Sequence, residues 1–407
     1  MAGALCGIPL TVLFTIVVIK PYYYNNYAVG ATGAASMSML IAGPLCAVCA
    51  ALQTSRLRDV LTQIDVAVRR SVVVAFWNFL AVPLAGMSCF IAACVTVGLG
   101  SDVGPFVPDG AITSIFAAGT VFCTGLGVLA GRFLPTTVAV PACLLVCYFW
   151  IAVTPAMDTL WIRHLTGAVP ECCTSDFVVS GDVLVANIAL GIAGAFVVGA
   201  LAVRRISVEA LLLTIAVLGA ASWFAVTRVD ELDAYPVQPR TSGLTCAGSR
   251  PAVCVWEEHR GSLGGLVSQA GLIREEFAGM GLELPERVSE SITGITDPSA
   301  GWVIHADRDA MSDADMRLDL VMGLLPVQPR TCGTRNPDQP RPVTDEYFEF
   351  ELWLASKGGT ADSELLNRVQ DPEELAAVQA VDGYSPAQLG SWFSNNRHQF
   401  DYCVTDR

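Results

Sequence analysis

The segment Gln53–Ser71, QTSRLRDVLTQIDVAVRRS, is the long polar interruption in an apolar N-terminal half. Its apolar side chains recur at helical spacing, so a helix here has one apolar face and one face rich in arginine. Short arginine-rich loops of membrane proteins stay in the cytoplasm. We therefore expect a cytoplasmic amphipathic helix that binds a cytoplasmic partner. Its predicted contact residues are Arg56, Leu57, Arg58, Leu61, Ile64, Arg69 and Arg70.

The charge of the 407-residue chain is divided unevenly. Residues 1–226 carry nine basic and nine acidic residues, whereas residues 227–407 carry 15 basic and 29 acidic residues and so account for the net charge of −14. With 53% hydrophobic and only 15% charged residues, the chain is too apolar for a soluble protein of this size. We expect a membrane domain followed by one acidic soluble domain. The acidic half argues against nucleic acid as a partner, because its phosphates would be repelled.

Apolar runs close to the length that crosses a bilayer, about 20 residues, fill the first half of the chain. They predict an all-α polytopic membrane bundle of about seven transmembrane helices in residues 1–226. A mostly helical α+β domain is expected in residues 227–407. The first run is short for a full span. The predicted spans are residues 3–19, 28–52, 72–98, 111–131, 136–156, 183–203 and 206–226.

The polar links between these spans alternate in charge. Every second link is rich in arginine, and the links between them hold six acidic residues with Arg163 as their one base. The positive-inside rule then places the N-terminus in the cytoplasm and residues 227–407 outside the cell membrane. Lys20 alone would favour the opposite orientation of the first helix, and we weigh seven arginines above it. The arginine-bearing links are 53–71, 132–135 and 204–205, and the acidic links are 99–110 and 157–182.

Small and polar residues inside the spans indicate close helix packing. Gly127 with Gly131, and Gly191 with Ala195, stand at spacings that let two helix backbones approach. Asn78 and Asn187 are polar groups at membrane depth, which face the bundle or a cavity. Structural hydrogen bonding is the first interpretation of both asparagines, and contact with a transported substrate is the alternative.

Six of the 14 cysteines lie in polar segments, an even number that suggests disulfides outside the cell. Cys246 with Cys254, and Cys332 with Cys403, is one of three possible connectivities for these four residues. The adjacent Cys172 and Cys173 should not bridge each other without strain, so they either stay free or bond to the outer domain.

The outer half shows several element signals. Residues 251–256 are predicted as a short strand, and an amphipathic helix is expected from Glu257 onward. Ser312 and Asp315 resemble a capping box. Helices are also expected at residues 372–381 and 385–396, whereas residues 347–355 fit a strand or a helix.

No chemistry of catalysis is visible in the sequence. The nucleotide-binding pattern G-x-x-x-x-G-K-[ST] is missing, and the chain has only two lysines, so ATP would have to be hydrolysed by another polypeptide. No zinc-binding spacing or nucleophile motif occurs. The run Glu257–His259 suits a helix N-terminus better than a metal site, and the acidic cluster of residues 307–315 lacks the glycine of a calcium loop. We expect no catalytic residue, cofactor or metal.

The order of these segments resembles that of ABC-2 type permeases. Such permeases have a six-span core, a cytoplasmic coupling helix between spans two and three, and short outer helices between spans five and six. Residues 54–70 stand at the place of the coupling helix, and residues 157–182 stand at the place of the outer helices. The resemblance covers residues 1–205. It lacks the N-terminal amphipathic helix of the family, and a further span leads here to a large outer domain.

The tail is similar to the outer domain of actinobacterial membrane proteins described as ABC transporter permeases. The stretches that carry this likeness are VCVWEEHR at 253–260, LWLASKG at 352–358 and LGSWFSN at 389–395. The resemblance implies a permease subunit of an ABC-type exporter, with a separate ATPase and either a second copy or a second permease as partners. The alternative is a membrane anchor that does not transport and displays its acidic outer domain as a receptor or assembly platform.

Overall fold

The computed structural model describes residues 2–19, 24, 26–61, 71–157, 159–170, 172–201, 208–232, 235–291, 302–304, 312–325, 344–359 and 372–399. The chain forms two compact units, Met1–Pro239 and Arg240–Arg407. The first unit is a helical bundle, and the second combines helices with one small sheet.

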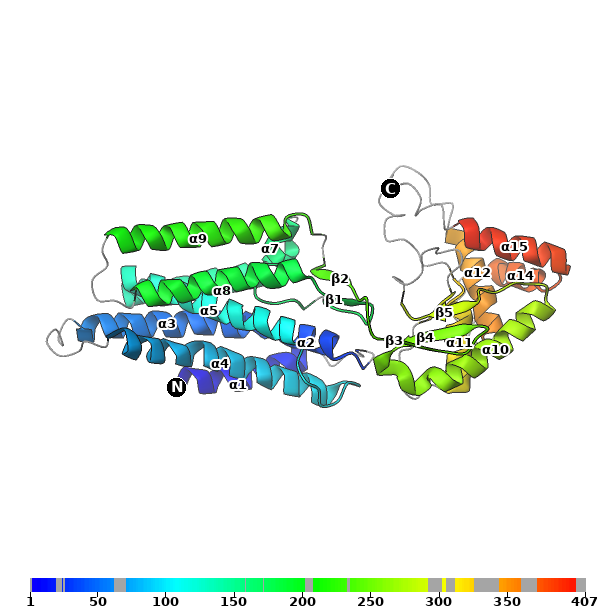
Figure 1. The fold of residues 1–407 in the computed structure, drawn as a ribbon, viewed down its shortest axis with the longest axis horizontal. Helices are drawn as coiled ribbons and strands as arrows, with labels where there is room; N and C mark the ends of the chain where they lie inside the picture. The colour runs from blue at the N-terminus through cyan, green and yellow to red at the C-terminus, as the bar shows by residue number, and fades with distance from the viewer. Residues whose placement is uncertain are drawn as a thin grey trace. The chain divides into compact units, whose positions relative to one another are not determined.

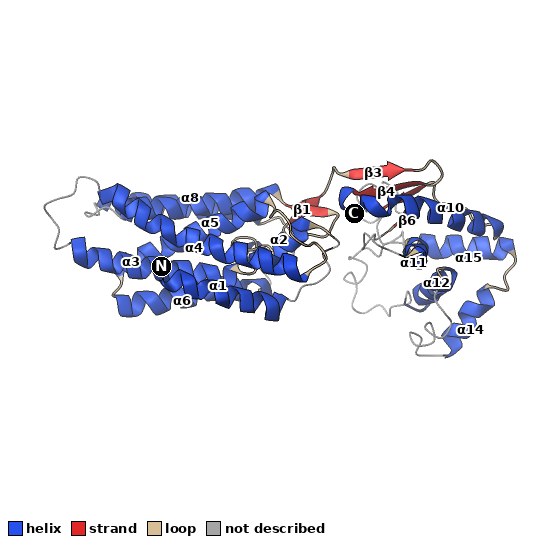
Figure 2. Cartoon of the chain, turned by 90° about the horizontal axis from the view of Figure 1, so that it is seen from below, coloured by secondary structure: helices blue, strands red, loops and turns tan. Residues whose placement is uncertain are grey.

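The first unit consists of long apolar helices that lie side by side in both views of the chain (Figures 1 and 2). A two-stranded antiparallel sheet at one end pairs Val178 of β1 with Gln238 of β2. In chain order the elements are α1 (Ala2–Phe14), the π-helical turn η1 (Thr15–Ile19), α2 (Ala28–Ser36), α3 (Met39–Leu61), α4 (Ser71–Gly100), α5 (Gly110–Phe133), α6 (Thr136–Ala152), the 3-10 turn η2 (Thr154–Ala156), α7 (Leu160–Arg163), β1 (Phe177–Val179), α8 (Gly181–Leu201), α9 (Val208–Val229) and β2 (Val237–Pro239).

Six of these described segments are long and apolar enough to cross a membrane, which makes the chain a multi-pass membrane protein by length and composition. The six are Ala28–Leu57, Phe79–Gly100, Gly110–Phe133, Thr136–Ala156, Gly181–Leu201 and Val208–Val229.

The prediction of seven spans is therefore corrected to six. In the first predicted span, the described residues hold the shorter apolar helix Gly7–Val18, which falls below the length of the six candidate spans. The arginine-bearing end of α3 consequently lies at the end of the first of the six candidate spans.

Helix α5 lies at the centre of the bundle, packed against α3 on one side and α8 on another. Half of its apolar window is buried, compared with 11% for α9, which borders the bundle. The main buried cluster consists largely of alanine, cysteine and phenylalanine from α3, α4 and α5. Small side chains in these helices allow the short distances between helix axes on which membrane bundles depend.

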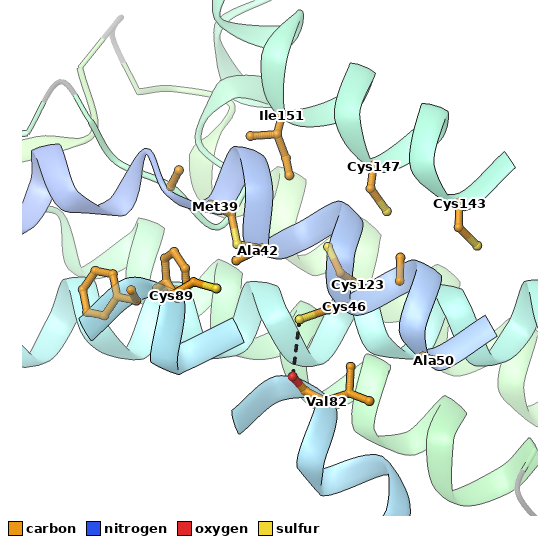
Figure 3. Packing of buried hydrophobic residues seen from close by; sticks show 14 of the residues in the cluster. Met39, Ala42, Cys46, Ala50, Val82, Cys89, Cys123, Cys143, Cys147 and Ile151 are labelled. Carbon is orange, nitrogen blue, oxygen red and sulfur yellow. Dashed lines mark hydrogen bonds between the residues drawn. The ribbon is translucent and has the colours of Figure 1, made fainter. Parts of the chain in front are cut away.

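Several buried cysteines lie between α3 and its neighbours. Figure 3 shows Cys143, Cys147 and Ile151 of α6 pointing toward α3. Cys46 on α3 donates its thiol proton to the carbonyl oxygen of Val82 on α4 at 3.6 Å. These thiols fill space as small apolar groups.

The second compact unit begins at Arg240, and the functional domain boundary after residue 226 stays a prediction. Residues of the intervening stretch stay with the first unit, because β2 pairs there with β1. The elements of the second unit are β3 (Leu244–Ala247), β4 (Ala252–Trp256), the 3-10 helix η3 (Glu257–Ser262), α10 (Leu263–Gly279), β5 (Arg287–Ser289), β6 (Trp302–Val303), α11 (Asp313–Met322), α12 (Thr344–Lys357), α14 (Pro372–Val381) and α15 (Pro386–Gln399).

The sheet of the second unit has the order β3-β4-β5-β6. Strands β3 and β4 form an antiparallel hairpin, whereas β4, β5 and β6 run parallel, and α10 connects β4 to β5. Leu266, Ile273 and Phe277 of α10 are fully buried, as the helical spacing predicted. The helix itself begins at Leu263 rather than Glu257, because the intervening residues form a 3-10 helix.

Most other element predictions for the second unit are confirmed. Ser312 and Asp315 form the capping box that starts α11, and Ser385 precedes α15 with its hydroxyl on Gln388. The segment left open between strand and helix is the helix α12, whose Phe350 and Trp353 are buried.

Candidate functional site

The arginine-bearing end of α3 is the first candidate site. The described part of the predicted amphipathic helix, Gln53–Leu61, continues α3 without a break. The side chain of Arg56 is exposed and that of Leu57 is half-buried. Thr54 and Ser55, on the same turn, are buried instead. The end of α3 therefore has one face toward the bundle and one face available to a partner.

The buried face of this end is tied to α5. The Ser55 hydroxyl donates to the carbonyl oxygen of Gly131 at 3.5 Å, and Thr54 donates to Ala50 of its own helix at 2.8 Å. A Cβ atom on Gly131 would lie 2.5 Å from the carbonyl oxygen of Ala51. Gly127, one turn earlier, would likewise meet the carbonyl oxygen of Ala47. The predicted Gly127–Gly131 pair thus lets the two backbones touch.

The remaining predicted contact residues lie partly outside the described chain. Arg58 and Leu61 belong to α3, but their side chains are not among the described ones, and Ile64, Arg69 and Arg70 lie outside the described residues altogether. Their part in a contact surface stays a prediction.

The other close approach joins α5 to α8. A Cβ on Gly125 would lie 2.7 Å from the carbonyl oxygen of Gly194, and one on Gly191 would lie 2.8 Å from the Cβ of Ala118. The predicted pair Gly191–Ala195 is therefore wrong in its second member. Ala195 is exposed, because the helix turns Gly194 rather than Ala195 toward α5.

Asn187 has the structural role that was our first interpretation. It is buried on α8, and its Nδ2 donates to the carbonyl oxygens of His164 and Val183, both at 2.9 Å. The bond to His164 ties the loop after α7 to the bundle. The side chain of Asn78 is not among the described ones.

A cavity of about 280 Å³ lies at the other end of α3, far along the helix from Leu61. Its wall includes Leu40 from the start of α3, Ile151 from the end of α6, and Ala168 and Val169 from the loop after α7. Arg163 also lines it. This group is the second candidate site.

Arg163 is only partly satisfied by the protein. Its Nη2 donates to the carbonyl oxygens of Pro155 at 2.9 Å and Met157 at 3.3 Å, whereas its Nε is buried and has no hydrogen-bond partner. A buried donor without a partner costs about 1–3 kcal/mol. Sequence reasoning missed this site, although one signal was present: Arg163 is the single base of an acidic loop.

The cysteine predictions had three different outcomes. Cys246 and Cys254 are confirmed as a disulfide, and the reason is their direct pairing across the β3–β4 hairpin. Cys332 and Cys403 lie outside the described residues. The structure places the adjacent Cys172 and Cys173 against each other rather than against a cysteine of the second unit, and the expectation that a bridge between them would be strained stays a prediction.

Polar clusters of the second unit serve its own packing. Arg240 forms hydrogen bonds with both carboxylate oxygens of Glu258, at 3.1 and 3.0 Å, and stacks over Trp256. The buried Glu290 accepts from the Trp256 backbone at 2.8 Å and contacts His259 Nδ1 at 2.5 Å. In the part of the chain that the structure describes, no three His, Cys, Asp or Glu side chains are grouped to hold a metal ion.

The three stretches behind the resemblance of the tail are packing segments. Trp353 from the second stretch meets Trp392 and Phe393 from the third, with ring centroids 5.4 and 6.1 Å apart. Val253 and Val255 from the first stretch are fully buried in the same core. Edge-to-face aromatic pairs of this kind add to the stability of a core.

The described chain combines six helices that are long and apolar enough to cross a membrane with a second compact unit. Residues 253–403 of that second unit match a protein family described as a domain of unknown function, DUF7224. The matched region contains all three packing stretches. No curated protein and no solved structure matches the chain.

Proposed function

We propose that the chain is the membrane permease subunit of an ABC-type exporter and works with a separate ATPase. In this proposal α1, extended by η1 to Ile19, is a first and shorter membrane segment. The arginine-bearing end of α3 faces the cytoplasm, and the second unit faces outward. The outer unit gates the exit or captures a partner, and a second copy or second permease completes the assembly.

The observation that carries the proposal is that the end of α3 has one exposed face and one face bonded to α5. Arg56 is exposed for a partner, while Ser55 on the same turn is bonded to Gly131 of α5. A push on this end is therefore passed to α5 directly. Because α5 is packed against α8 through Gly125 and Gly194, the displacement continues into a third helix. A movement of an ATPase bound at Arg56 would therefore be transmitted to the centre of the bundle.

The direct test is the double charge reversal Arg56→Glu with Arg58→Glu. We expect the tagged wild-type chain, drawn from its native host in a mild detergent, to bring down a stoichiometric polypeptide with a nucleotide-binding P-loop and ATPase activity. The double variant should lose that polypeptide, by about tenfold or more, since like charges would replace attractive ones. Mass spectrometry of the eluate measures the amount of the co-purified polypeptide, and an ATPase assay measures its activity.

The matched control is Arg228→Glu, which reverses a half-exposed arginine near the end of α9. It should keep the ATPase, and all variants should reach the membrane in equal amounts. Co-purification that is unchanged in the double variant would refute docking at this helix end. A wild-type chain that brings down no ATPase would refute the exporter and favour the membrane-anchored receptor or assembly protein.

A further inference from the structure

We propose that the cavity beside Arg163 binds an anionic phospholipid, with a headgroup phosphate oxygen on the guanidinium and the adjoining chain against the apolar wall. This site is separate from the ATPase contact at the other end of α3. The proposal holds whether or not the chain is an exporter.

The size and lining of the cavity fit the headgroup phosphate of a lipid together with the adjoining part of its chain. Its volume of about 280 Å³ is just below the range of about 300–1,000 Å³ in which proteins enclose whole small ligands. The wall is mostly apolar, with Leu40, Ile151 and Val169 as its larger side chains. A free inorganic anion would leave this apolar surface unused, whereas a lipid covers it with its chain.

The charge of the site favours an anion. Among the described contacts, Arg163 bonds to two backbone carbonyl oxygens and makes no ion pair with a carboxylate. An arginine has five N–H donors in a fork that matches phosphate oxygens, and its Nε here has no partner.

Three described carboxylates of the neighbouring segments are engaged elsewhere. Asp102 accepts from the backbone of Tyr24 at 2.9 Å, and Asp109 accepts from Ile112 at the start of α5, also at 2.9 Å. Asp182 pairs with Arg228 at 3.5 Å. An anion from the membrane can therefore balance the charge of Arg163, which these described carboxylates do not neutralise.

Aromatic side chains place the cavity at the level of lipid headgroups. Tyr148 and Trp150, in the last turns of α6, are 45% and 37% exposed, and the Trp150 indole donates to the carbonyl oxygen of Leu165 at 3.4 Å. Exposed tyrosine and tryptophan gather where the bilayer meets water. Ile151, the next residue of α6, lines the cavity.

The experiment is native mass spectrometry of the full chain, purified in detergent and given equal amounts of phosphatidylglycerol and phosphatidylcholine. The wild type should retain phosphatidylglycerol in preference. Arg163→Gln should retain about tenfold less of it, because the charge-assisted hydrogen bonds to phosphate are lost. Arg228→Gln removes an arginine that already has a carboxylate partner and should behave as the wild type.

A second variant keeps the test decisive if Arg163→Gln fails to fold. Ala152→Phe leaves Arg163 in place and fills the cavity, and it should reduce retention of phosphatidylglycerol as well. Glycerol phosphate, added as the soluble headgroup, should not displace the lipid. Equal retention of the two lipids by the wild type, unchanged retention in both variants, or displacement by glycerol phosphate would each overturn the proposal.

Discussion

Gly127 determines how closely α3 can approach α5. The atom that a side chain would meet there is the backbone carbonyl oxygen of Ala47, which cannot turn aside as a flexible side chain would. By contrast, a Cβ on Gly199 of α8 would meet no atom within 4 Å. Two glycines in the same bundle therefore differ in what they do, although both look like ordinary membrane glycines in the sequence.

We expect Gly127→Leu to lower the midpoint of thermal unfolding of the detergent-solubilised chain by several degrees, because overpacking costs about 1–3 kcal/mol. Gly199→Leu serves as the control and should leave the midpoint within about a degree. Size-exclusion chromatography after heating measures both. An equal response of the two variants would contradict the contact between α3 and α5 described above.

At the scale of elements, the β3–β4 hairpin depends on a disulfide between directly opposed residues. Cys246 and Cys254 pair in register, with Cα atoms 4.0 Å apart, the short separation of pairs that exchange no backbone hydrogen bonds. Val253 and Val255 flank the bridge on β4 and are fully buried. The bridge thus ties the edge strand β3 to the strand that contributes these core residues.

Replacement of Cys246 and Cys254 by serine should destabilise the second unit by about 2–3 kcal/mol through loss of loop closure. Proteolysis of the full chain in increasing urea measures the effect on this unit. A reducing agent should bring the wild type to the level of the variant and leave the variant itself unchanged. A wild type that resists urea equally with and without reductant would exclude a stabilising bridge.

The elements themselves were largely predictable, and the reason is local. An apolar run near 20 residues, a capping pair such as Ser312–Asp315, or a 3.6-residue repeat along α10 determines its own conformation from neighbouring residues. Which residue of a helix faces a particular partner is not local. Gly194 rather than Ala195 meets α5, and that choice depends on the rotation of α8 within the bundle.

At the scale of the whole molecule, the two candidate sites differed in how far the sequence could find them. The end of α3 is one continuous segment, so its alternation of arginine and apolar residues could be recognised. The cavity joins Leu40 of α3 with Ile151 of α6 and Arg163 of α7, and the long helices α4 and α5 separate Leu40 from the other two along the chain. No pattern in a single sequence relates such residues.

We expect the second unit to lie outside the cell membrane, because six candidate spans and the arginine-rich links together require it. The shorter helix α1 does not affect this side, since it precedes the first of the six. Alkaline phosphatase, which is active only after export, fused behind Arg407 should be active in a bacterial host. A fusion behind Leu61 should be inactive. Activity of the Leu61 fusion together with inactivity of the Arg407 fusion would show that the orientation is opposite to the one expected.

The position of α5 between α3 and α8 also has a consequence for biosynthesis. Gly127 and Gly131 contact α3, which is synthesised before α5. Gly125 contacts Gly194 of α8, which is synthesised three helices later. At ordinary rates of synthesis that interval is on the order of seconds. During this interval, the glycine face of α5 that later contacts α8 is exposed to lipid. A nascent chain stalled before α8 would therefore be a preferred substrate for membrane quality-control proteases.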